Sequence, residues 1–109
     1  MIEVLQYVTP NGVNVFDDWM QRMKDKKALA VLAARLERLT DGNLGDCKQV
    51  GGGVLELRIH YGPGYRIYLT RLHETCVLLL CGGDKRHQSA DIARAIEYLK
   101  DYRRRSANP

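Results

Sequence analysis

The sequence has no long apolar run and few cysteines. No apolar segment reaches the roughly 18 residues that a membrane-spanning helix needs, and the first residues lack the basic and then apolar pattern of a secretory leader. We therefore expect a cytoplasmic protein with no membrane segment. The three cysteines, Cys47, Cys76 and Cys81, are odd in number and lack metal-ligand spacing, so we expect reduced thiols, no metal site and no cofactor.

Internal repeats, low-complexity tracts and linkers are also missing from the sequence. A chain of 109 residues can bury one core but has no room for a second. The composition, 45% hydrophobic and 28% charged, is typical of a globular protein. We expect one domain over residues 1–109.

Charge is distributed unevenly along the chain. Residues 1–45 carry six Lys/Arg and six Asp/Glu, whereas residues 46–109 carry eleven Lys/Arg and seven Asp/Glu, which accounts for the whole net charge of +4. A basic half on a neutral scaffold suggests a polyanionic partner. A run such as Arg103-Arg104-Arg105 is, however, more often a solvated tail.

Hydrophobic periodicity predicts the order of elements. Residues 2–8 predict a strand, followed by a turn at residues 9–12 and a helix that Asn14 caps, with Asp17 in its first turn. A second helix is predicted over residues 25–40, and the two apolar helices suggest a helical hairpin lying on a sheet. From Lys48 the period changes to two, and strands are predicted at residues 54–61, 65–71 and 75–81, the last ended by Gly82-Gly83. A last helix over residues 89–102, with a frayed end, completes an α+β domain with an antiparallel-rich meander of three or four strands.

The alternation separates two faces of the strand at residues 54–61. Leu55, Leu57, Ile59 and Tyr61 fall on one face, and Glu56, Arg58 and His60 fall on the other. If residues 62–64 form a three-residue turn, Tyr61 lies opposite Tyr65 and His60 opposite Arg66. Arg66, Tyr68 and Thr70 then join the polar face, although a one-residue slip would scatter this cluster.

Two interpretations of the polar face remain open. Antiparallel sheets often leave one face in water, so Glu56 and Arg58 can form an ordinary surface ion pair. The stretch Gly82-Gly83-Asp84-Lys85-Arg86-His87 instead adds basic groups beside two arginines, a combination that suits a phosphodiester backbone.

Three segments carry a family resemblance: FDDWMQRMKD, LTDGNLGDCKQVGGGVLELRIHYGPGYRIYL and LLLCGGDKRHQSADIARA. With the element order, they resemble the RelE/ParE toxin superfamily, in particular its addiction-module killer proteins related to HigB. The resemblance implies a RelE-like fold, a cytoplasmic type II toxin and an antitoxin partner, expected to be a helix-turn-helix protein whose complex with the toxin also binds operator DNA. For RelE and HigB members it implies ribosome-dependent cleavage of mRNA and inhibition of translation.

Residue roles are carried over only where these motifs match. Arg58 falls at a catalytic basic position of RelE-type enzymes, Arg66 in the GYR motif falls on their catalytic arginine, and Lys85 and Arg86 match their basic pair after the last strand. The chain departs from RelE at Ile92, where a catalytic tyrosine is expected, and at Glu56, where a lysine is expected.

These residues suit metal-independent RNA cleavage, in which the 2′-hydroxyl attacks the adjacent phosphate. We expect Arg58 and Arg66 to stabilise the phosphorane and Lys85 or Arg86 to hold the phosphate. His60, His87 and Glu56 are candidates for acid–base catalysis. Tyr61 and Tyr65 are candidates for stacking on bases, or for core packing. We thus predict a catalytic set of Arg58, Arg66, Lys85 and His87, and an RNA-binding set of Glu56, His60, Tyr61, Tyr65 and Arg86.

Other functions are compatible with the same sequence. A ParE-type toxin would inhibit DNA gyrase and would not need the basic cluster. A non-catalytic nucleic-acid or ribosome-binding module would show salt-dependent binding without turnover. The chain can also be an inactive remnant kept for its complex with an antitoxin.

Overall fold

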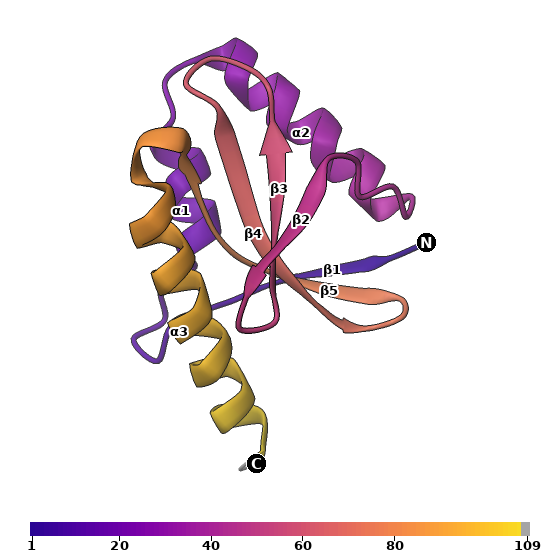
Figure 1. Ribbon diagram of the computed structural model, residues 1–109, viewed down its shortest axis with the longest axis vertical. Helices are drawn as coiled ribbons and strands as arrows, with labels where there is room; N and C mark the ends of the chain where they lie inside the picture. Colours follow the sequence, from indigo (N-terminus) through magenta and orange to yellow (C-terminus); the bar gives the residue numbers. More distant parts are fainter. Residues whose placement is uncertain (108–109) are drawn as a thin grey trace.

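The computed structural model describes residues 1–107, which form a mixed α+β domain (Figure 1). The elements are β1 (Glu3–Gln6), α1 (Val15–Arg22), α2 (Lys26–Thr40), β2 (Cys47–Gly51), β3 (Val54–Ile59), β4 (Tyr65–His73), β5 (Cys76–Asp84), a 3-10 turn (Lys85–His87) and α3 (Gln88–Ala107). Over residues 1–107, no helix combines the length and the apolar character needed to cross a membrane.

The five strands form one sheet in the order β1-β5-β4-β3-β2. Strands β2 to β5 are an antiparallel meander, and β1 pairs in parallel with β5. The expected α+β class and antiparallel-rich meander are confirmed. The sequence did not single out β2 as a separate strand, because this edge strand, CKQVG, is mostly exposed and shows little hydrophobic alternation.

Local sequence signals account for the start of each N-terminal helix. The Asn14 side chain caps α1 by accepting from the Asp17 amide at 3.0 Å, and the Asp25 carboxylate caps α2 by accepting from the amide of Lys27 at 2.9 Å. These bonds satisfy amides that have no partner within the helix. Both predicted helices are therefore confirmed within a few residues.

Two apolar clusters lie on opposite faces of the sheet. On one face α1 and α2 cover the first cluster, which includes Phe16, Leu32, Leu57 and Ile67. On the other face α3 covers the second cluster, and its members include Tyr68, Leu78, Leu80, Ala95 and Leu99. Helices α1 and α2 diverge over the sheet, α1 against β5 and α2 against β3, so they cover it as separate elements rather than as a tight hairpin (Figure 1).

The end of β5 corrects the expectation that Gly82 and Gly83 terminate the strand. Strand β5 runs through both glycines to Asp84 and pairs with β4 along this stretch. The glycines are needed for packing instead: a methyl group at Gly82 would overlap the Trp19 ring, and one at Gly83 would overlap the Asp91 carboxylate. The missing side chains thus let α1 and α3 approach the end of β5 closely.

The C-terminal end of α3 is also better anchored than expected. Helix α3 continues to Ala107, and Asp101 accepts a hydrogen bond from the Tyr7 hydroxyl at 2.6 Å and pairs with Arg104 and Arg105 at 2.8 and 2.7 Å. Arg105 also donates to the Val8 carbonyl. Burial and the neighbouring Asp101 raise the pKa of Tyr7 to about 12. The expectation of a frayed end is therefore wrong, because Arg105 ties the helix to the segment that follows β1. Arg104 and Arg105 remain exposed to solvent, as the interpretation of a solvated run predicts.

Candidate phosphate-binding cleft

The pairing of β3 with β4 brings the predicted polar residues to one face. Arg58 pairs with Arg66 and Glu56 with Tyr68, and residues 60–64 form the connecting loop. The expected pairing of Tyr61 with Tyr65 and of His60 with Arg66 is wrong, because the chain leaves β3 at Ile59 and turns through Gly62 and Gly64, both with positive φ. The true register differs by two residues, which preserves the side-chain face.

This polar face is covered by protein rather than by water. Glu56 and Tyr68 are fully buried and Arg66 is 9% exposed, because the start of α3 lies over them. The interpretation of an ordinary solvated face is therefore wrong. A charged residue placed in the interior must be compensated by specific partners.

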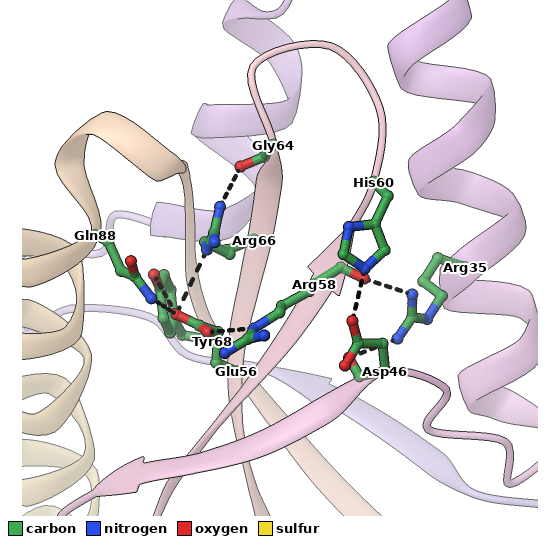
Figure 2. Close-up of polar contacts among 9 residues, drawn as sticks. All are labelled: Arg35, Asp46, Glu56, Arg58, His60, Gly64, Arg66, Tyr68 and Gln88. Atoms are coloured by element: carbon green, nitrogen blue, oxygen red, sulfur yellow. Dashed lines mark hydrogen bonds and ion pairs between the residues drawn. The ribbon is translucent and has the colours of Figure 1, made fainter.

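Glu56 receives this compensation from four side chains (Figure 2). Its Oε1 accepts from Arg58 Nε at 3.2 Å, and its Oε2 accepts from the Tyr68 hydroxyl at 3.1 Å and from Gln88 Nε2 at 2.9 Å. Arg66 Nε lies 3.6 Å from the same Oε2. Burial and the Glu56 charge raise the pKa of Tyr68 well above its ordinary value. Glu56 is thus a buried anchor for two arginines, and it is placed where it cannot reach bound RNA.

Above this anchor the surface opens into a cleft of about 410 Å³. It is lined by residues 58–66 and Lys85, so that the β3–β4 loop forms one wall and the start of the 3-10 turn forms the other. Arg58 has 32% of its side chain exposed and Arg66 has 10%. Three cationic side chains therefore line the cleft above a single buried carboxylate, and the local charge is positive.

Arg66 is held at the floor of this cleft. Its Nη1 donates to the Gly64 carbonyl at 2.8 Å, which ties the guanidinium to the loop. Within residues 1–107, Arg66 Nε is buried and has no hydrogen-bond acceptor. A planar cation fixed in this way is suited to an anion that enters from the open side.

Three residues at the rim add ring systems to the cationic floor. Tyr61 and Tyr65 line the cleft and also pack against the first apolar cluster, Tyr65 in edge contact with Trp19 at 6.0 Å. His60 is exposed, and its Nε2 lies 2.6 Å from Asp46 Oδ2. The hydrogen bond with His60 and the nearby positive charges lower the pKa of Asp46. The two roles weighed for the tyrosines, base contact and core packing, are compatible with this position.

Besides the buried Glu56, the structure places two more of the predicted site residues outside the cleft. His87 Nδ1 lies 3.0 Å from Asp84 Oδ1 and lines a neighbouring hollow. Arg86 is exposed on the 3-10 turn and does not line the cleft. Burial raises the pKa of Asp84, but its bonds with His87 and the backbone outweigh this effect and leave the pKa lowered. Asp84 also caps the 3-10 turn, since its side chain accepts from the His87 amide at 3.3 Å.

Sequence reasoning missed Arg35, a buried residue that supports the segment behind the cleft without lining it. This arginine of α2 is only 6% exposed, and it donates to the carbonyl oxygens of Arg58 at 2.8 Å and Asp46 at 3.0 Å (Figure 2). It also donates to the Leu44 carbonyl at 2.8 Å. It thereby fixes the segment before β2 against the end of β3. The signal was present, because Arg35 lies on the same helical stripe as the buried Leu32 and Leu39.

The chain is 49% identical over 80 residues to an uncharacterized protein of Haemophilus influenzae, and the match covers 73% of this chain and 81% of that protein. At this identity and coverage the two proteins belong to one family. None of the protein-family models searched matches the chain.

Proposed function

We propose that the protein is a toxin of the RelE/ParE superfamily that cleaves ribosome-bound mRNA without a metal ion, and so inhibits translation. The observation that carries the proposal is the cleft, in which Arg58, Arg66 and Lys85 lie around one opening. A cleft of this charge fits a phosphodiester, since guanidinium groups pair with two phosphate oxygens at once. The strand–helix–helix–meander–helix order supports a RelE-like fold for the domain.

The chemistry follows from the position of the cations. Attack of a ribose 2′-oxygen on the adjacent phosphorus adds negative charge to the phosphate oxygens. Arg66 is already fixed by Glu56 and Gly64, so it would stabilise that charge without reorganising. Arg58 would act from the same face, and Lys85 from the opposite wall. Tyr61 and Tyr65 at the rim would contact the bases on either side of the scissile bond.

The buried anchor favours an RNA target over DNA gyrase. Burying the Glu56 charge costs free energy through desolvation. A ribonuclease would gain two positioned arginines from this buried carboxylate, whereas a gyrase inhibitor would have no need of them. A toxin of this class acts in the cytoplasm and requires an antitoxin. We expect a helix-turn-helix partner with an acidic segment opposite the cleft, and this complex would also bind operator DNA.

The direct test is induced expression in a bacterium, with growth recorded and mRNA 5′ ends mapped by primer extension. Wild-type protein should arrest growth and produce new cuts within translated codons, and Arg66→Ala should abolish both. Arg71→Ala is the matched control, because Arg71 lies on the same strand, is exposed and contacts only the Glu74 carbonyl among the bonds found in residues 1–107. It should behave as wild type.

Each other outcome selects a different function. Arrest with DNA-damage signalling and no cuts would indicate a gyrase inhibitor. Salt-dependent RNA or ribosome binding without cuts would indicate a binding module. Arrest and cuts that persist in Arg66→Ala would show that the cleft is not the active site.

A further inference from the structure

Metal-independent RNA cleavage needs a base for the 2′-hydroxyl proton, and the cleft offers few. The sequence offers three acid–base candidates, Glu56, His60 and His87. Glu56 is fully buried and His87 lies in another hollow, whereas His60 lines the cleft itself. The other titratable groups that line the cleft are tyrosines, arginines and a lysine, whose ordinary pKa values lie far above neutrality. His60 is the one imidazole among the residues that line the cleft, and imidazole is the side chain most often used as a general base.

The contact between His60 and Asp46 fixes which ring nitrogen is available. Asp46 Oδ2 lies 2.6 Å from His60 Nε2 (Figure 2), and an ionised carboxylate only accepts hydrogen bonds. In the neutral imidazole the proton therefore resides on Nε2. Nδ1 then carries the lone pair, on the edge of the ring away from Asp46. This is the protonation state that a general base requires.

Asp46 is itself held in place from inside the domain. Arg35 donates to its backbone carbonyl at 3.0 Å and to the carbonyl of Arg58 at 2.8 Å, and the Arg58 amide donates back to the Asp46 carbonyl at 2.9 Å. The segment that carries Asp46 is thus bonded to the strand that carries Arg58. These bonds fix the position of the Asp46 backbone relative to Arg58, and so place its carboxylate beside His60 at the rim of the cleft.

The charged groups around this pair come from every element that contacts it. Asp46 is the acidic neighbour of His60, Arg35 approaches from α2, Arg58 from β3, and Lys85 stands on the opposite wall of the cleft. The hydrogen bond with His60, followed by the charges of His60, Arg58 and Arg35, keeps the pKa of Asp46 below its usual range. These interactions therefore favour the ionised carboxylate beside the histidine.

We propose that His60 is the general base of the cleft and that Asp46 is the residue that positions it. This inference rests on the proposed function. His60 Nδ1 takes the 2′-hydroxyl proton while the O2′–P bond forms and the P–O5′ bond breaks, and the electron pair of that bond goes to O5′. Water at the open mouth gives O5′ its proton, and His60 later returns its own to solvent. The products are a 2′,3′-cyclic phosphate and a 5′-hydroxyl end.

The test is single-turnover cleavage of mRNA on programmed ribosomes between pH 5.5 and 8.5, on the order of three pH units around the ordinary pKa of histidine. His60→Gln should lower the rate at neutral pH by about 100-fold or more, with little change in affinity for an mRNA carrying 2′-deoxyribose at the cut site. The side chain is 76% exposed, so the fold should be retained and thermal unfolding checks this. His73→Gln, an exposed histidine at the β4–β5 turn, is the matched control and should be silent.

Asp46 is tested by the shape of the pH profile. Removing the carboxylate makes protonation of the ring less favourable, so Asp46→Asn should move the acid limb of the profile to lower pH and reduce the plateau. Asp46→Glu, which keeps the charge, should recover part of the plateau. A merely structural role would lower the rate without moving the limb.

The outcomes separate this inference from the proposed function. Normal cleavage by His60→Gln, or an unmoved acid limb in Asp46→Asn, would overturn the role of the pair. The proposed ribonuclease activity would still be supported if Arg66→Ala abolished cleavage. If the wild-type protein fails to cleave at any pH, both the ribonuclease and its general base are wrong.

Discussion

The buried carboxylate beneath the cleft makes Glu56→Gln the most informative substitution in this protein. The change keeps the size of the side chain but removes its charge, and an amide nitrogen takes the place of one oxygen. Two arginines then lose their counter-ion. The new amide nitrogen faces either Arg58, in place of Oε1, or both Tyr68 and Gln88, in place of Oε2, and in each case a donor meets a donor. Arg66, 10% exposed, has little access to water in compensation.

The magnitude follows from this burial. Removing one partner of a buried ion pair costs about 3–5 kcal/mol, because it leaves an uncompensated charge in the interior. Arg58 is one-third exposed and can turn to solvent, so the lower end of that range, about 3 kcal/mol, is expected. For a domain of this size each kcal/mol lowers Tm by about 4–8 °C, so Tm should fall by roughly 12–24 °C.

The assay is equilibrium unfolding in urea followed by circular dichroism. The control is Glu97→Gln, which removes a carboxylate from an exposed pair with Lys100, 3.3 Å apart, and should cost less than about 0.5 kcal/mol. A loss below about 1 kcal/mol for Glu56→Gln would refute the reasoning, since it would mean that water or an alternative partner replaces the carboxylate. Ribonuclease activity should fall as well, even at temperatures where the variant is folded, because both arginines lose their fixed position.

Three further results are expected. Gly83→Ala should lower the free energy of unfolding by about 1–3 kcal/mol in urea titrations, because the added methyl group overlaps Asp91. Asp101→Asn should flatten the pH dependence of Tm at acid pH. The hydrogen bond from Tyr7 and the neighbouring arginines lower the pKa of Asp101 in the folded state. The stability that Asp101 contributes is therefore full above the unfolded pKa of about 3.9 and is lost as pH falls through the folded pKa. Lys85→Ala should reduce mRNA cleavage by about 10- to 100-fold without changing Tm, because Lys85 is exposed.

Much of the fold could be predicted because its signals are local. Asn14 and Asp25 are placed where a helix needs an acceptor for free amides, and the structure uses both in that way. The alternation along β3 separated its apolar residues from Glu56 and Arg58, and that separation depends only on the two-residue period of a strand. Even the two-residue error in register preserved the faces.

What could not be predicted depends on contacts between distant segments. The polar pattern of β3 and β4 gives no sign that α3 would cover Glu56, and the same alternation is typical of a solvated face. The role of Arg105 depends on Tyr7 and Val8 at the other end of the chain. Asp46 has no pattern of its own, because only the folded segment before β2 brings it to His60.

The glycines of β5 illustrate a second limit. Gly82-Gly83 is a common signal for the end of a strand, and the sequence alone predicts that end at these residues. The structure uses it for close packing on both faces, with Trp19 on one side and Asp91 on the other. Glycine can either end a strand or allow close packing within one, so only the neighbouring side chains in the folded protein distinguish the two roles.

The cleft lies at one end of the sheet face that α3 covers, where polar contacts replace the apolar packing found along the rest of the helix. Along the middle of the sheet, α3 packs on apolar residues. At the start of the helix Gln88 instead donates to Glu56, which also accepts from Tyr68 of β4. Arg66 Nε is buried and lies 3.6 Å from Glu56 Oε2, too far for a hydrogen bond, so this ion pair compensates its burial only in part. Sequences keep such unfavourable groups mainly where function requires them. The arrangement is therefore easier to explain as a floor prepared for an anion than as a device that stabilises the fold.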